Sequence, residues 1–234
     1  MRRQFPIVVC IVSLALWPST LLADEPKIEK VAAEVALKRL QDGNARFVAD
    51  QLPPRDPFPV QRAKTADSQH PFAVILTCAD SRVGPEIIFN QQLGDIFVVR
   101  VAGNVTSPDI TGSIEYAVEH LGPTLVVVLG HGSCGAVQAA LSGDKLEGNL
   151  ETLIKHVDVG KDLPKEKAAA LDSAVKNNVL HQMEHLTRDS SVLKEFAATQ
   201  RIRIVGGVYS LRSGKVEWLE MPGEPKLKSG PAKK

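Results

Sequence analysis

Two patterns of apolar residues alternate along the middle of the chain. Runs of Val, Ile and Leu typical of strands buried on both faces occur at residues 72–78, 95–104 and 124–130. Segments with an apolar period of about 3.6 residues, typical of helices, lie at 84–93, 107–122 and 134–141. Continuous apolar strands that alternate with helices predict an α/β fold, with a mostly parallel central sheet flanked by helices.

The chain before this core is predicted to be a helical arm. Residues 25–49 have apolar positions at a helical period, and Gly43-Asn44 is expected to interrupt the helix near its end. A proline-rich connector at 50–59 and a short helix at 60–68 follow. We expect the arm to pack on something other than its neighbours in sequence.

The chain after residue 143 is more polar and predicted to be largely helical. Helices are expected at 149–160, 164–190 and 190–200, followed by a strand and hairpin over 201–221 that turns at Ser213-Gly214. The long helix carries an apolar stripe, which we interpret as packing only, formed by Val175, Val179, Leu180, Met183 and Leu186. The α/β domain is placed at 61–222, with a polar tail at 223–234.

The first 23 residues have the layout of a secretory signal peptide. Arg2 and Arg3 precede an apolar run, and Ala23 precedes an acidic start. Cleavage near Ala23 would leave the arm and connector, 24–60, at the mature N-terminus. We therefore expect a periplasmic or secreted protein without stable membrane association. An uncleaved membrane anchor is the alternative, although it would have to include Pro18. The arginine pair allows the twin-arginine route beside the general secretory route.

Charge and cysteine content narrow the classes of function. The 234 residues carry a formal net charge of +1, so no nucleic-acid partner is expected. Cys10 lies in the predicted signal peptide, which leaves Cys78 and Cys134 in the mature chain. Two cysteines in an exported protein most often form one disulfide, so a disulfide is one interpretation.

The turn after the strand at 124–130 allows two further interpretations. Gly130-x-Gly132-x-x-Gly135 matches the dinucleotide-binding pattern, but the expected strand about twenty residues later is replaced by a helical pattern. His131 and Cys134 within the turn are metal-binding residue types, and Cys78 ends another strand. Because chemistry collects at the carboxyl ends of parallel strands, these three residues could form a Cys2His set with one open position, as in catalytic zinc sites.

Cys-x-Asp-Ser-Arg at 78–82, followed by His-x-x-Cys-Gly at 131–135, resembles the β-class carbonic anhydrases. The similarity covers roughly residues 30–210, with matching segments at 36–48, 85–104, 112–122 and 126–137. It implies the fold of that family and one Zn²⁺ per chain on Cys78, His131 and Cys134. It also implies a lyase that reversibly hydrates carbon dioxide to bicarbonate and a proton, by attack of zinc-bound hydroxide.

The resemblance also implies roles for residues around the metal. Asp80 and Arg82 match a dyad in which the arginine holds the carboxylate away from zinc, so that it accepts a hydrogen from the bound water. Gln69, Phe97 and Tyr116 match residues that line the substrate cleft in members with an open metal site. Members regulated by bicarbonate carry Trp where this chain has Ile75. The open form is therefore expected.

Members of the family are dimers or dimers of dimers whose cleft is completed by a neighbouring subunit, so we expect a homodimer or homotetramer. One alternative keeps the fold but takes carbon disulfide or carbonyl sulfide as substrate. A non-catalytic exported zinc or disulfide protein is the other. The Asp80–Arg82 pair argues against it, because a structural zinc has four protein ligands and needs no such dyad.

Overall fold

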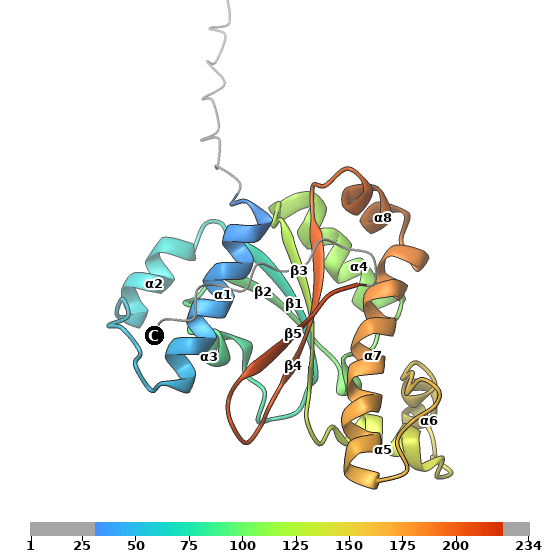
Figure 1. Ribbon diagram of the computed structural model, residues 1–234. Coiled ribbons are helices and arrows are strands. Elements are labelled where there is room, and N and C mark those ends of the chain that lie inside the picture. The colour runs from blue at the N-terminus through green and yellow to red at the C-terminus, as the bar shows by residue number, and fades with distance from the viewer. Residues whose placement is uncertain (1–30, 222–234) are drawn as a thin grey trace, which may run out of the picture.

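The computed structural model describes residues 31–221, which are organised around a five-stranded sheet of order β2-β1-β3-β4-β5 (Figure 1). Four strands are mutually parallel: β1 (Ala73–Thr77), β2 (Ile96–Arg100), β3 (Leu125–His131) and β4 (Arg203–Tyr209). The fifth, β5 (Val216–Leu219), pairs antiparallel with β4. The predicted α/β class with a mostly parallel sheet is confirmed, as is the hairpin that closes it.

Helices pack on both faces of the sheet. Those before β3 are α1 (Ala33–Val48), α2 (Phe58–Thr65), α3 (Pro85–Ile88), the 3-10 turn η1 (Ala102–Asn104), α4 (Pro108–Tyr116) and the π turn η2 (Ala117–Leu121). Those after β3 are α5 (Gly135–Ser142), α6 (Asn149–Ile154), α7 (Lys167–Asp189) and α8 (Ser191–Ala198). The long helix α7 lies on the opposite face of the sheet from α1 (Figure 1).

The alternation of side chains along the strands sets these two layers. In β1, Ala73 and Ile75 join the apolar cluster of α1 and α3, whereas Val74 and Leu76 join that of α4, α7 and α8. Every residue of β1 and β3 is buried. A strand buried on both faces has no polar side, which is why these segments are continuous apolar runs rather than alternating ones.

Gly43-Asn44 does not interrupt the first helix, and that expectation is wrong. Helix α1 continues to Val48, because the glycine serves a close approach rather than a turn. A Cβ on Gly43 would overlap the carbonyl oxygen of Phe89, so only glycine lets α1 lie so near the end of α3.

Asn44 fastens the predicted arm to the rest of the chain. Its Nδ2 donates to the carbonyl oxygens of Gly214 at 2.8 Å and Ile88 at 3.3 Å, and its Oδ1 accepts from the Val216 amide at 3.0 Å. The arm therefore packs on α3 and on the β4–β5 hairpin of its own subunit, far from it in sequence.

The boundary between α7 and α8 is set by one serine. Ser190 leaves the helical conformation, ends α7, and accepts a hydrogen bond from the Leu193 amide as the N-cap of α8. At the other end of α7, the Glu166 carboxylate accepts from the Ala168 and Ala169 amides. These caps set where α7 begins and where it ends.

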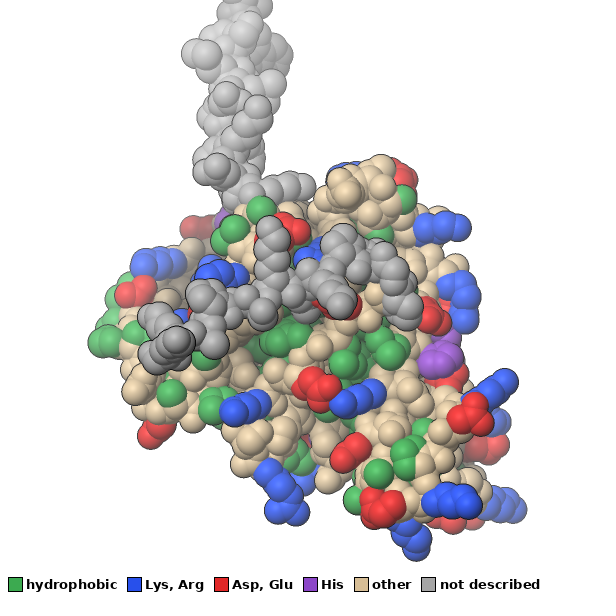
Figure 2. All heavy atoms as spheres, in the orientation of Figure 1, with side chains coloured by type: hydrophobic (Ala, Val, Ile, Leu, Met, Phe, Trp, Pro, Cys, Tyr) green, Lys and Arg blue, Asp and Glu red, His purple; other side chains and the backbone are tan. Residues whose placement is uncertain are grey.

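On the face drawn in Figure 2, basic and acidic side chains are interspersed. Among the helices of residues 31–221, none combines the length and hydrophobicity needed to cross a membrane. The predicted signal peptide at 1–23 and polar tail at 223–234 lie outside the described residues.

We expect Asn44→Ala to lower the free energy of unfolding by about 2–3 kcal/mol, because it leaves buried backbone groups of the hairpin without partners. Urea denaturation monitored by circular dichroism measures this. Asp42→Ala is the matched control, since its side chain is exposed and forms an ion pair with exposed Lys38; it should cost less than about 0.5 kcal/mol. Equal losses in the two variants would contradict the anchoring role of Asn44.

Candidate metal centre

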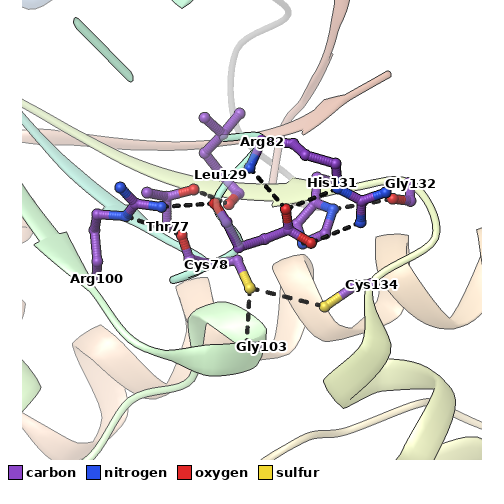
Figure 3. Close-up of polar contacts among 10 residues, drawn as sticks. Thr77, Cys78, Arg82, Arg100, Gly103, Leu129, His131, Gly132 and Cys134 are labelled. Carbon is purple, nitrogen blue, oxygen red and sulfur yellow. Dashed lines mark hydrogen bonds and ion pairs between the residues drawn. The ribbon is translucent and has the colours of Figure 1, made fainter. Parts of the chain in front are cut away.

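Three potential metal ligands meet where β1 and β3 end. Cys78 directly follows β1, His131 is the last residue of β3, and Cys134 precedes α5. Their ligand atoms all lie within 4.8 Å of one another, and the three residues are 4%, 0% and 1% exposed. Figure 3 shows the two sulfur atoms facing each other beside the imidazole. The predicted Cys2His cluster is therefore present.

The turn between His131 and Cys134 is built for close packing. The Gly132 amide donates to the Tyr209 carbonyl at 2.9 Å, which ties the turn to β4. A Cβ on Gly130 would come within 2.6 Å of Val179 Cγ2, so this glycine lets α7 lie directly against β3.

From residue 132 to 202 the chain forms helices and loops, with no strand to carry a ribose-binding acid. The dinucleotide interpretation is thus excluded.

His131 is oriented as a metal ligand. A carbonyl oxygen can only accept, so Nδ1 carries the proton and donates to the Gly132 oxygen at 2.9 Å. The Nε2 lone pair then faces the sulfurs, and this buried atom has no hydrogen-bond partner among residues 31–221. Buried polar atoms are rarely left without one. A cation between Nε2 and the two sulfurs would satisfy it.

The two cysteines are thiols and not a disulfide. Their sulfur atoms are 4.0 Å apart, against about 2.05 Å in a disulfide. The hydrogen bond between the two sulfur atoms lowers the pKa of the Cys78 thiol and raises the pKa of the Cys134 thiol. Neighbouring buried thiolates repel each other, and a divalent cation removes that repulsion. Two thiolates and an imidazole suit zinc.

Asp80 and Arg82 form a bidentate pair at the edge of this cluster. Arg82 donates from Nε to Oδ1 at 2.9 Å, from Nη2 to Oδ2 at 2.7 Å, and from its backbone amide to Oδ1 at 2.9 Å. These bonds hold the pKa of the Asp80 carboxyl well below its usual range. Its Oδ2 lies 3.8 Å from Nε2 of His131, so the carboxylate borders the cluster while it stays on the arginine.

Arg100 holds the loop that carries both Cys78 and Asp80. Its guanidinium donates from Nε to the Cys78 carbonyl at 3.1 Å and from Nη2 to the Asp80 carbonyl at 2.7 Å (Figure 3). Arg100 was not among the site residues predicted from the sequence. Its signal was a single basic residue within the apolar run 95–104, at the carboxyl end of a strand.

The three predicted cleft residues lie apart from the cluster. Gln69 is exposed in the loop between α2 and β1. Phe97 pairs in register with Val74, and its ring centroid is 6.4 Å from that of Tyr116, which is 49% exposed. Within residues 31–221, no hydrogen bond or ring contact joins these three side chains to the three ligands. The structure therefore assembles five of the eight predicted site residues within one chain.

Comparison with known proteins gives the family of this fold and site. Residues 73–216 match the carbonic anhydrase family. A carbonic anhydrase of Mycolicibacterium smegmatis is 42% identical over 188 residues, which cover 78% of this chain and 91% of the relative. Carbonic anhydrase 2 of Mycobacterium tuberculosis is 41% identical over 198 residues, with coverage of 81% and 93%. The chain belongs to the carbonic anhydrase family.

Solved structures define the class within that family. A tetrameric β-carbonic anhydrase of Sordaria macrospora superposes with a TM-score of 0.61 at 26% identity, covering 75% of this chain and 90% of that one. The Coccomyxa β-carbonic anhydrase in complex with acetazolamide gives a TM-score of 0.63 at 29% identity, with coverage of 77% and 83%. The fold is that of the β class.

Proposed function

We propose that this protein is a zinc-dependent β-carbonic anhydrase that reversibly hydrates carbon dioxide to bicarbonate and a proton. The observation that carries this proposal is the buried cluster of Cys78, His131 and Cys134, in a chain 42% identical to a carbonic anhydrase over most of its length. Zinc bound there supplies the Lewis acidity that lets water ionise near neutral pH.

Asp80 is suited to orient the attacking water. An ionised carboxylate only accepts hydrogen bonds, and Arg82 keeps this one ionised. Arg82 donates two hydrogen bonds to Oδ1 and one to Oδ2. Oδ2, which lies 3.8 Å from Nε2 of His131, can therefore accept a further hydrogen bond. A water that donates to Oδ2 has its own lone pair free to face the carbon of carbon dioxide.

The same pair keeps one position on the metal open. Asp80 is two residues from Cys78, close enough in sequence to act as a fourth ligand. Arg82 holds both of its oxygens in a fork, a strong and geometrically specific interaction. We infer that the carboxylate stays on the arginine, so that three protein ligands hold the metal and the fourth position is free for chemistry.

The separation of Gln69, Phe97 and Tyr116 from the cluster supports an oligomer in which two subunits complete each cleft. We propose a homodimer or a dimer of dimers. The connector and α2 present large exposed apolar side chains, Leu52, Phe58 and Val60. Apolar side chains gathered on one segment are typical of a surface covered by a partner. The related Sordaria macrospora enzyme is described as tetrameric.

We further propose that residues 1–23 act as a cleaved signal peptide and that the enzyme works in the periplasm or outside the cell. The support is the sequence pattern alone: two arginines, an apolar run, and Ala23 before an acidic start.

The purified protein should hydrate carbon dioxide rapidly in stopped-flow assays, contain about one zinc per chain, and lose activity to a chelator.

Asp80→Asn should lower kcat by roughly 10- to 100-fold at unchanged zinc content, because the amide lacks the charge and one of the two acceptor oxygens. Glu86→Gln, an exposed acid six residues away, serves as the control and should leave kcat unchanged. Full zinc with no hydration, or an Asp80→Asn variant as fast as the parent, would contradict the proposal.

Multi-angle light scattering should give the mass of a dimer or a tetramer. Phe58→Glu should shift the mass toward the monomer and reduce hydration, because a charge is costly to bury at an interface. Leu150→Glu on α6 is the matched control, an exposed apolar residue outside the connector and α2. A monomeric parent with full activity would rule out the shared cleft.

Expression of the full chain in a bacterium with a periplasm should yield a periplasmic product whose intact mass lacks about the first 23 residues. Replacing Arg2 and Arg3 by lysine separates the routes, since only twin-arginine export depends on that pair. An intact chain that stays in the membrane fraction would support the anchor instead.

A further inference from the structure

Two amide side chains interrupt the buried face of α7. Asn178 and Gln182 are both 0% exposed, one helical turn apart, among Val175, Val179 and Met183 of the apolar stripe. Burying an amide in an apolar layer costs free energy unless its donors and acceptors are paired. The apolar stripe predicts packing only, so the two amides call for an explanation.

Their hydrogen bonds connect two loops beside the metal centre. Asn178 donates from Nδ2 to the Gly103 carbonyl at 2.8 Å, and its Oδ1 accepts from the Asp158 amide and from Gln182, both at 3.1 Å. Gln182 also donates to the His156 carbonyl at 2.9 Å. Its Oε1 accepts from the amide and the hydroxyl of Thr106, each at 2.8 Å. The amides therefore hold η1 and the segment after it against the loop that follows α6.

Gly103 links this network to a metal ligand. Its carbonyl accepts from Asn178, and its amide donates to Cys78 Sγ at 3.3 Å (Figure 3). The residue has φ 74° and ψ 12°, a left-handed conformation that favours glycine. A Cβ there would lie 3.0 Å from Ala136 Cβ and 3.2 Å from Val157 Cγ2, so side chains also confine the residue. Asn178 thus holds the residue whose amide reaches the ligand sulfur.

We propose that Asn178, supported by Gln182, is a positioning residue that keeps the Gly103 amide on Cys78 Sγ and thereby sets the affinity of the site for zinc. This inference rests on the zinc site of the proposed function. An amide that donates to a thiolate stabilises its charge in a buried setting and fixes the direction of its lone pairs. Without Asn178 to hold the Gly103 carbonyl, the peptide can turn and the N–H···S bond is lost.

A purely structural role for Asn178 predicts a different outcome, and Asn177 provides the matched control. It is the preceding residue of α7 and donates from Nδ2 to the Val159 carbonyl at 2.9 Å. Asn177→Ala therefore loosens the same loop after α6 but leaves the bond to Gly103 intact. If both variants lose stability to the same extent, that loss reflects packing. If only the Asn178 variants lose affinity for zinc, Asn178 positions the metal ligand.

The test uses the full chain with Zn²⁺ and Co²⁺ as probes. Asn178→Ala should bind Zn²⁺ about 10- to 100-fold more weakly than the parent in competition with a chromophoric chelator. The near-isosteric Asn178→Leu should show the same loss, and it carries the test if the alanine variant does not fold. The thiolate-to-cobalt charge-transfer band should shift in the same variants. Asn177→Ala should stay within about twofold of the parent.

Asn178 variants that melt earlier yet bind Zn²⁺ as tightly as the parent, with an unshifted cobalt band, would overturn the inference. So would an Asn177→Ala variant that loses as much affinity. Carbon dioxide hydration is measured separately at saturating zinc. A parent protein that binds zinc but does not hydrate carbon dioxide would refute the proposed function. The role of Asn178 would still be decided by the zinc affinities of the variants.

Discussion

The metal centre depends on the parallel pairing of β1 with β3. In their register Thr77 lies opposite Leu129, so Cys78 and His131 emerge from the same edge of the sheet. The Thr77 hydroxyl donates to the Leu129 carbonyl at 2.9 Å, a buried bond that ties the last paired positions together (Figure 3). A shift of one strand by one residue would turn the ligand at its end toward the other face of the sheet, away from its partner. The buried bond between Thr77 and Leu129 opposes such a shift, as does the close fit of Gly130 against Val179 of α7.

Around that edge, Cys78 and His131 are each held by a different neighbour. The Gly132 carbonyl orients the imidazole of His131, the Gly103 amide reaches the sulfur of Cys78, and Arg100 clamps the carbonyls of the loop between the strand and Asp80. Arg82 then keeps the nearby carboxylate ionised. Outer contacts of this kind orient ligands and tune the metal, so the site extends well beyond its three donor atoms.

The sequence predicted the sheet and the ligand cluster well, because strands buried on both faces and a metal-binding turn leave local patterns. The predicted interruption of the helix at Gly43-Asn44 was wrong. The glycine there allows a close approach to Phe89, a residue distant in sequence, and the helix continues. The prediction from the sequence missed Arg100, Asn178 and Gln182, because a periodicity of apolar residues says nothing about polar partners brought in by the fold. In the proposed oligomer, Gln69, Phe97 and Tyr116 act together with a second chain, whose position no local pattern of one chain can predict.

We expect three residues to bind one zinc while Asp80 remains on Arg82. X-ray absorption at the zinc edge, combined with an anomalous map of the zinc-loaded crystal, can decide this. The spectrum and the map should show two sulfur ligands, from Cys78 and Cys134, one nitrogen from His131, and a fourth position that no residue fills. A carboxylate oxygen of Asp80 in that fourth position, or a bond between the two sulfurs, would contradict this expectation.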